Sequence, residues 1–157
     1  MTAKELLKAA LAAQSEIETL KMERERLLAL AGPATAKYSD MPGGGPNDLS
    51  GVERCVDGLM ELDAKLTDQT RAMLELMRDA DLLIRQVKKP RHREVLRLRY
   101  LCGLSWPQVR DKMVYTDVNS AHKIHGWALI DAERIWQRME AERNGKHATP
   151  ADDPAIY

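Results

Sequence analysis

The chain has 157 residues, enough for one or two small domains, and its apolar fraction of 44% is sufficient to build a core. Aromatic residues make up only 4%, with no Phe, and Leu, Ala, Met, Glu, Lys and Arg dominate, which favours helices over sheets. The formal net charge is zero, but residues 85–125 hold 10 basic and 3 acidic side chains, against 10 and 15 in residues 1–84. This local excess is a candidate contact for a polyanion, with a solvated helix face as the alternative.

Cysteine placement and the first residues indicate the compartment. Cys55 and Cys102 lie far apart within apolar helical patterns, which predicts buried thiols in a reducing environment rather than a disulfide. The opening MTAKELLKAALAAQ carries charges inside its apolar stretch, so it predicts neither a signal peptide nor a membrane span. We therefore expect a cytoplasmic protein without a membrane partner.

A first helix is expected over residues 1–32. Thr2 and Glu5 form the two ends of a capping box, and apolar residues then recur at spacings of three and four until Gly32-Pro33 ends the helix. Residues 33–49 contain three prolines and a glycine triplet, which predicts a flexible linker.

A second, longer helix is expected over residues 50–89, starting at the capping box Ser50–Glu53. Its apolar positions alternate in steps of four and three, which is typical of a coiled-coil-like seam. The partner of this seam is either the first helix, folded back as a hairpin, or residues 52–87 of a second copy in a homodimer. The seam positions are Val52, Val56, Leu59, Asp63, Leu66, Thr70, Met73, Met77, Ala80, Ile84 and Val87.

Three shorter helices are expected between residues 90 and 143. Pro90 suits the first turn of one that Gly103 closes, and Ser105 caps the next. Asp117 is a good cap for the third, which runs to about Glu142. Tyr100 and Trp106 are expected in the core. The remainder, residues 144–157, shows no periodicity and is expected to be disordered.

Two helices joined by a tight turn, the second entered through a cap, form a helix-turn-helix pattern. In such a pair the first helix braces the second, whose opening turns enter the major groove, while flanking cations neutralise phosphates. We therefore expect an all-α protein with an N-terminal helical hairpin followed by a helix-turn-helix domain that binds double-stranded DNA.

The segment REVLRLRYLCGLSWPQVRDKMVYTDVNSAHKIHGWAL resembles region four of bacterial sigma factors. The matching residues are Arg93, Val95, Leu96, Leu98, Arg99, Tyr100, Gly103, Leu104 and Ser105, with Val109 and the closing pair Ala128-Leu129. Leu104-Ser105-Trp106 and His125 to Leu129 are closer still to phage regulators of the ArpU and RinA type. The resemblance implies transcriptional regulation of phage or prophage late genes in a bacterial host cell. Where the family usually has glycine before the recognition helix, this chain has Val114-Tyr115.

With the cap at Asp117, one stripe of the third short helix is buried and another faces outward. The stripe expected in the core contains Ala121, Ile124 and Ala128. The residues expected to read base edges are Val118, Asn119, Ser120 and His122. Those expected on phosphates are Arg91, Arg93, Arg97, Arg110, Lys112 and Lys123. Each of these has a solvated surface side chain as its alternative.

Other classes of function fit the sequence less well. His122 and His125 share a helix face, but no further ligands complete a zinc site, and no phosphate loop or nucleophile motif is present, so neither an enzyme nor a metal or cofactor site is expected. Two alternatives remain. One is another phage DNA-binding protein, such as a small terminase subunit, and the other is a coiled-coil module that contacts RNA polymerase.

Overall fold

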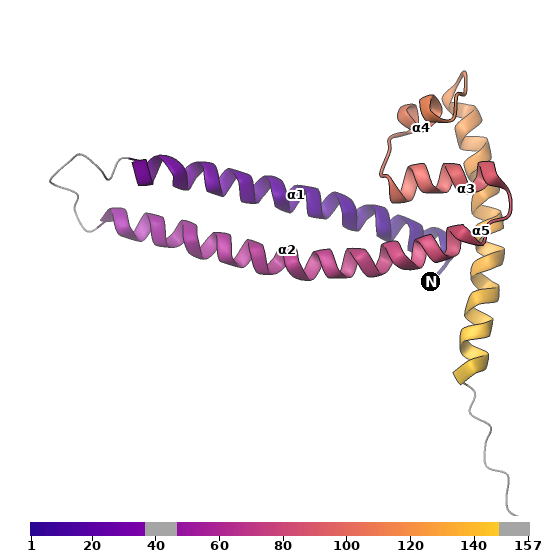
Figure 1. The fold of residues 1–157 in the computed structure, drawn as a ribbon, viewed down its shortest axis with the longest axis horizontal. Coiled ribbons are helices and arrows are strands. Elements are labelled where there is room, and N and C mark those ends of the chain that lie inside the picture. The colour runs from indigo at the N-terminus through magenta and orange to yellow at the C-terminus, as the bar shows by residue number, and fades with distance from the viewer. Residues whose placement is uncertain (37–46, 148–157) are drawn as a thin grey trace, which may run out of the picture. The chain divides into compact units, whose positions relative to one another are not determined.

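The computed structural model describes residues 1–36 and 47–147, and every regular element in these ranges is helical (Figure 1). This confirms the expected all-α class. No helix in the described ranges is both long and apolar enough to cross a membrane. The elements are α1 (Ala3–Ala36), α2 (Asn47–Arg85), α3 (Pro90–Leu96), the π-helical turn η2 (Arg97–Leu101), α4 (Trp106–Lys112) and α5 (Val118–His147).

Several helix ends differ from the predicted ones. α1 passes through Gly32-Pro33 to Ala36, because a proline so near the end of a helix removes only one of its last hydrogen bonds. α2 begins at Asn47, so Ser50 lies inside the helix and is not its cap. α5 extends to His147, and the first four residues of the expected disordered tail are therefore helical. Residues 37–46 of the expected linker and 148–157 of the tail lie outside the described residues.

The chain divides into two compact units. One is residues 12–75, and the other combines residues 1–11 with the chain from residue 76 onward. Both α1 and α2 contribute to each unit. The second unit therefore extends beyond the expected DNA-binding domain of residues 90–143, because it includes the first turns of α1 and the last turns of α2.

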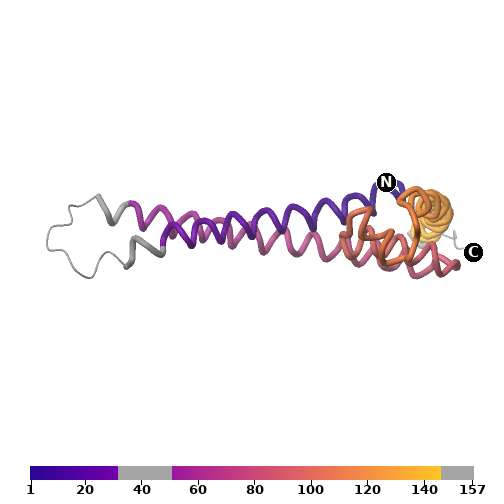
Figure 2. Tube along the Cα trace, turned by 90° about the horizontal axis from the view of Figure 1, so that it is seen from above, coloured from indigo at the N-terminus to yellow at the C-terminus, as the bar shows by residue number. Residues whose placement is uncertain are grey.

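In the unit of residues 12–75, α1 and α2 run side by side in opposite directions (Figures 1 and 2). Arg24 Nε of α1 lies 2.6 Å from Asp63 Oδ1 of α2, which gives the polar seam position Asp63 a partner. A Cβ on Gly58 would lie 3.5 Å from Leu27 Cδ1, so the two helices approach closely there. At these positions, α2 packs against α1 of the same chain, one of the two arrangements that the sequence left open.

The other unit has a continuous apolar core to which every described helix contributes. Leu6 and Leu7 of α1 are 2% and 0% exposed, and Leu83 and Ile84 of α2 are fully buried beside them in the core. Removing one such side chain from water contributes about 1.5–3 kcal/mol. The other buried members are Ala3, Ala10, Ala80, Val87, Val95, Leu96, Tyr100, Val109, Met113, Ala121, Ala128, Ala132, Ile135 and Trp136.

The N-terminus is tied to the middle of α5 by two hydrogen bonds. Trp136 Nε1 donates to the Met1 carbonyl at 2.7 Å, and the backbone N of Ala3 donates to Glu133 Oε2 at 2.8 Å. The carboxylate of Glu133 accepts one of the N–H groups that the first turn of a helix leaves unpaired. These bonds join residues more than a hundred positions apart, and they hold α5 against the start of α1.

Candidate nucleic-acid interface

The brace in front of the candidate interface is α3 continued by η2. η2 ends where the backbone N of Cys102 donates to the Arg97 carbonyl at 2.9 Å, an i to i+5 bond. Gly103 then adopts φ 69°, a left-handed conformation that glycine reaches without a side-chain clash. Leu104 N donates back to the Leu98 carbonyl at 3.1 Å and closes the turn. The predicted closure by Gly103 is confirmed. The expectation of buried thiols was wrong for Cys102, which is exposed at this turn, and Cys55 is half-buried.

α4 starts where the sequence predicted it to start. Ser105 has an extended backbone, and its N–H donates to Gln108 Oε1 at 2.8 Å in a capping box. Pro107 occupies the first turn, where its missing N–H costs nothing. Val109 is fully buried, and the helix ends at Lys112.

The turn between α4 and α5 contains a strained residue. Val114 has φ 58° and is 86% exposed. A β-branched residue therefore occupies the left-handed region, and its side chain makes little packing contact that could offset the strain. Val114 N donates to the Asp111 carbonyl at 3.2 Å, and Tyr115 N to the Arg110 carbonyl at 3.0 Å. The turn therefore has a left-handed conformation that glycine adopts readily, with valine in its place.

Asp117 caps α5, as the sequence predicted. Its Oδ1 accepts a hydrogen bond of 2.7 Å from the backbone N of Ser120, which satisfies one of the free N–H groups of the first turn. The cap fixes the phase of the helix, and Ala121 and Ala128 become fully buried while Ile124 is half-buried.

The four residues expected to read bases all lie in the first two turns of α5. Asn119 and His122 are exposed, and Val118 and Ser120 are half-buried. His122 has a neighbour that the sequence did not reveal, because its ring centroid lies 4.2 Å from that of Trp106 in α4. Asn119 and His122 are thus the two exposed polar side chains of the four, and the ring of His122 is held against Trp106.

Behind this surface, a histidine connects η2, α4 and α5. Tyr100 Oη and His125 Nε2 form a hydrogen bond of 2.8 Å, and the Trp106 ring meets His125 edge-on at 4.8 Å. Burial lowers the pKa of His125 to about 4, with smaller contributions from the positive charges of His122, Arg99 and Lys4. His125 is therefore uncharged at neutral pH. Burial also raises the pKa of Tyr100, and the core position expected for Tyr100 is confirmed.

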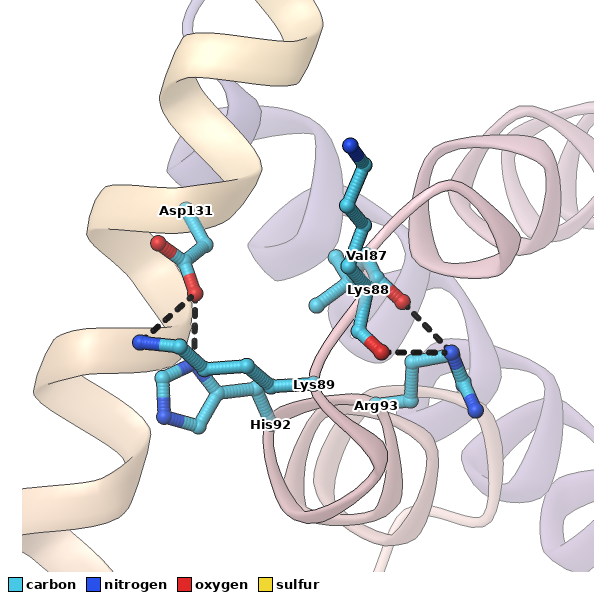
Figure 3. Close-up of polar contacts among 6 residues, drawn as sticks. All are labelled: Val87, Lys88, Lys89, His92, Arg93 and Asp131. Carbon is cyan, nitrogen blue, oxygen red and sulfur yellow. Dashed lines mark hydrogen bonds and ion pairs between the residues drawn. The ribbon is translucent and has the colours of Figure 1, made fainter.

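Two of the arginines expected on phosphates have hydrogen-bond partners within the chain. The guanidinium of Arg93 donates to the carbonyls of Val87 at 2.8 Å and Lys88 at 3.1 Å, just beyond the end of α2 (Figure 3). Arg97 donates to Asp81 Oδ1 of α2 at 2.7 Å. An acid of α2 thus pairs with Arg97, whereas Arg99 donates to the Leu104 carbonyl at 2.7 Å.

The remaining residues expected on phosphates differ in whether they pair with other side chains of the protein. Arg91 lies 3.2 Å from Glu94 and over the ring of Tyr115, and Arg110 pairs with its neighbour Asp111. Lys112 and Lys123 are exposed and form no hydrogen bond or ion pair with the described part of the chain. They are therefore the two predicted cations with the most freedom to meet an external anion.

A further group of cations surrounds the junction of α2 and α3, and the sequence pattern did not predict it. Asp131 of α5 lies 2.6 Å from His92 Nδ1 and 4.0 Å from Lys89 Nζ (Figure 3). The signals in the sequence were the pair Lys88-Lys89 before Pro90 and two arginines four residues apart on α5. These four cations lie around a groove of about 290 Å³. The groove is lined by Gln86, Lys88, Lys89, Asp131, Arg134, Ile135 and Arg138.

The described residues contain no cluster of three or more His, Cys, Asp or Glu side chains that could hold a metal ion. His122 and His125, the pair considered for such a site, instead pack against Trp106. No protein-family model, curated protein or solved structure matches the chain.

Proposed function

We propose that this protein binds double-stranded DNA through α4 and α5 and regulates transcription of phage or prophage genes. The observation that carries the proposal is the start of α5. A capped helix begins there with exposed polar side chains, after a short turn from a second helix that packs against it. This is the arrangement by which a helix-turn-helix presents its second helix to the major groove.

The charge of α5 supports a polyanionic partner. From Val118 to Ile130 the helix contains Lys123 and two histidines but no Asp or Glu. Phosphate groups would therefore meet no repelling carboxylate along this part of α5.

Individual roles follow from exposure and chemistry. Asn119 can donate to and accept from an adenine edge in the major groove, which makes it the proposed base-reading residue. Lys123 and Lys112 are proposed phosphate contacts because both are exposed cations. The regulatory role rests on the resemblance of Arg93 to Leu129 to sigma region four and to the ArpU and RinA type of phage regulator.

Fluorescence anisotropy with labelled duplexes tests the proposal. We expect the affinity of the full chain to fall steeply as the salt concentration rises, since cations on phosphates release counterions from the duplex. Lys123→Ala should weaken binding to all duplexes, whereas Asn119→Ala should mainly reduce the preference for a selected sequence. Lys65→Ala provides the control, because Lys65 is exposed in α2 within the other unit. Binding that is absent or independent of salt would contradict the proposal.

A further inference from the structure

The face of α5 that points away from the core stays exposed well beyond the first two turns. Its members recur at helical spacing, and the last two are large apolar residues, Trp127 at 56% and Ile130 at 53% exposure. We call this set the outer face of α5. It comprises Asn119, Lys123, Gly126, Trp127 and Ile130, all of them exposed.

Gly126 is the unusual member of the outer face. A glycine inside a helix is less favourable than alanine, because it gives up more backbone freedom and packs nothing. Nothing within the described chain requires it. A Cβ built on Gly126 would meet no atom within 4 Å, and its φ does not lie in the left-handed region. Gly51 and Gly145 are equally open in their helices, and Gly126 differs from them in its place on the outer face, between Lys123 and Ile130.

The charges on the outer face indicate which partner approaches it. Lys123 lies one turn before Trp127, and Arg134 lies one turn after Ile130. A second copy packed here in the antiparallel sense would set Lys123 against Arg134 of its partner, and a parallel copy would set each cation against itself. Like charges opposed in this way are destabilising. A polyanion satisfies both cations.

Helix geometry shows that one duplex can reach this far. Asn119 and Gly126 are seven residues apart, which corresponds to about 10 Å along a helix. The major groove is about 12 Å wide. A duplex that meets Asn119 in the groove would therefore have its sugar–phosphate backbone near Gly126.

We propose, building on the proposed DNA-binding function, that the sugar–phosphate backbone of the duplex crosses α5 at Gly126. The absent side chain lets the backbone come close to the helix there. Trp127 and Ile130 then contact the sugars at the edge of the groove, with Arg134 beyond them. The outer face is thus a second part of the DNA interface, one helical turn past the residues that read bases.

Glycine substitutions in the full chain test this inference, with two measurements that should move in opposite directions. We compare the wild type with Gly126→Ala and Gly126→Leu, using a labelled duplex of roughly two turns with a randomised sequence. Gly126→Ala should raise the melting temperature because alanine favours the helix. It should also weaken DNA binding by about tenfold, and Gly126→Leu should weaken binding further.

Gly145 and Gly51 supply the controls, since an added Cβ meets nothing within 4 Å at either position. Gly145→Ala lies on the same helix, and both control variants should leave DNA affinity unchanged. Wild-type binding together with undiminished binding by both Gly126 variants would overturn the inference and leave the proposed function intact. Absent wild-type binding would instead remove the proposed function, and this inference with it. Sedimentation showing that Gly126→Leu dissociates a dimer, at unchanged DNA affinity, would assign the outer face to a second copy and overturn the inference.

Discussion

The hydroxyl of Tyr100 and Nε2 of His125 lie 2.8 Å apart and connect the π-helical turn η2 to the second turn of α5. Tyr100 is 4% exposed and belongs to the core, whereas His125 lies at the edge of the core in edge-on contact with the ring of Trp106. The bond therefore couples the position of α5, the proposed DNA-contacting helix, to the brace in front of it.

The pKa of His125 predicts how stability depends on pH. In the folded chain this pKa is lowered to about 4, against 6.5 for an ordinary histidine, mainly by burial. Between these values the unfolded chain takes up a proton that the folded chain does not. The contribution of His125 is therefore fully present above pH 6.5, and it is lost as the pH falls toward about 4.

Urea denaturation of the wild type and His125→Gln at pH 7 and near pH 5 measures this effect. We expect the free energy of unfolding of the wild type to fall more between the two pH values than that of the variant. His122→Gln is the comparison: it removes only a smaller contribution to the lowered pKa of His125, so this variant should keep most of the wild-type fall. Equal losses in the wild type and in His125→Gln would show that His125 does not titrate as proposed.

Val114 should be replaceable with a gain in stability. Its left-handed φ of 58° is costly for a β-branched residue, and at 86% exposure it contributes little packing. Val114→Gly should raise the free energy of unfolding by about 1 kcal/mol, after allowing for the flexibility that glycine adds to the unfolded chain. The free energy of unfolding of Val114→Asn should lie between those of the wild type and Val114→Gly, because asparagine tolerates this conformation. Thermal melts in which the wild type is more stable than both variants would show that Val114 is not strained.

Substitution of Arg93 should mainly reduce the stability of the fold, whereas substitution of Lys123 should mainly reduce DNA binding. Arg93→Ala leaves the carbonyls of Val87 and Lys88 without their donor, so we expect a loss of about 1–2 kcal/mol in the free energy of unfolding. Lys123→Ala should change that free energy by less than about 0.5 kcal/mol, because Lys123 is exposed.

DNA binding should show the opposite pattern. Lys123→Ala should lower the slope of log affinity against log salt by about one, and Arg93→Ala should leave the slope unchanged at a temperature where the variant is folded. A lower slope for Arg93→Ala would show that Arg93 contacts phosphate as well as the end of α2.

The start of α1 should be essential for the unit that contains α5. Leu7 is fully buried in the core shared with α2 and α5. Leu7→Ala should therefore cost about 2–5 kcal/mol, measured by the loss of helical circular dichroism in urea. Leu28→Ala, at an exposed position of the same helix, is the matched control. A similar small loss in both variants would mean that residues 90–143 fold without α1.

Much of the candidate site was predictable from the sequence because its signals are local. Ser105 with Gln108, and Asp117 with Ser120, are pairs three residues apart, and each fixed the start of a helix. The buried positions of Ala121 and Ala128 then followed from helical spacing. The end of α1 and the start of α2 were less predictable, because helices tolerate glycine, proline or an internal serine near their ends.

The tertiary contacts were not predictable, because they join residues far apart in the sequence. Nothing local shows that Arg97 pairs with Asp81, or that Trp136 binds the carbonyl of Met1. The same holds for His122, whose helix phase predicted an outward side chain but not its contact with Trp106. Residue type and charge pattern identified the cations, and only the fold separated those that hold elements together from those left exposed.

The central claim is that the opening turns of α5 meet DNA, and an NMR titration of the full chain with a duplex tests it most directly. We expect the backbone amides of residues 118–126 to shift first and most, while those of residues 12–31 in the other unit stay in place. Shifts that gather in α1 and α2 and leave residues 118–126 unchanged would contradict the claim.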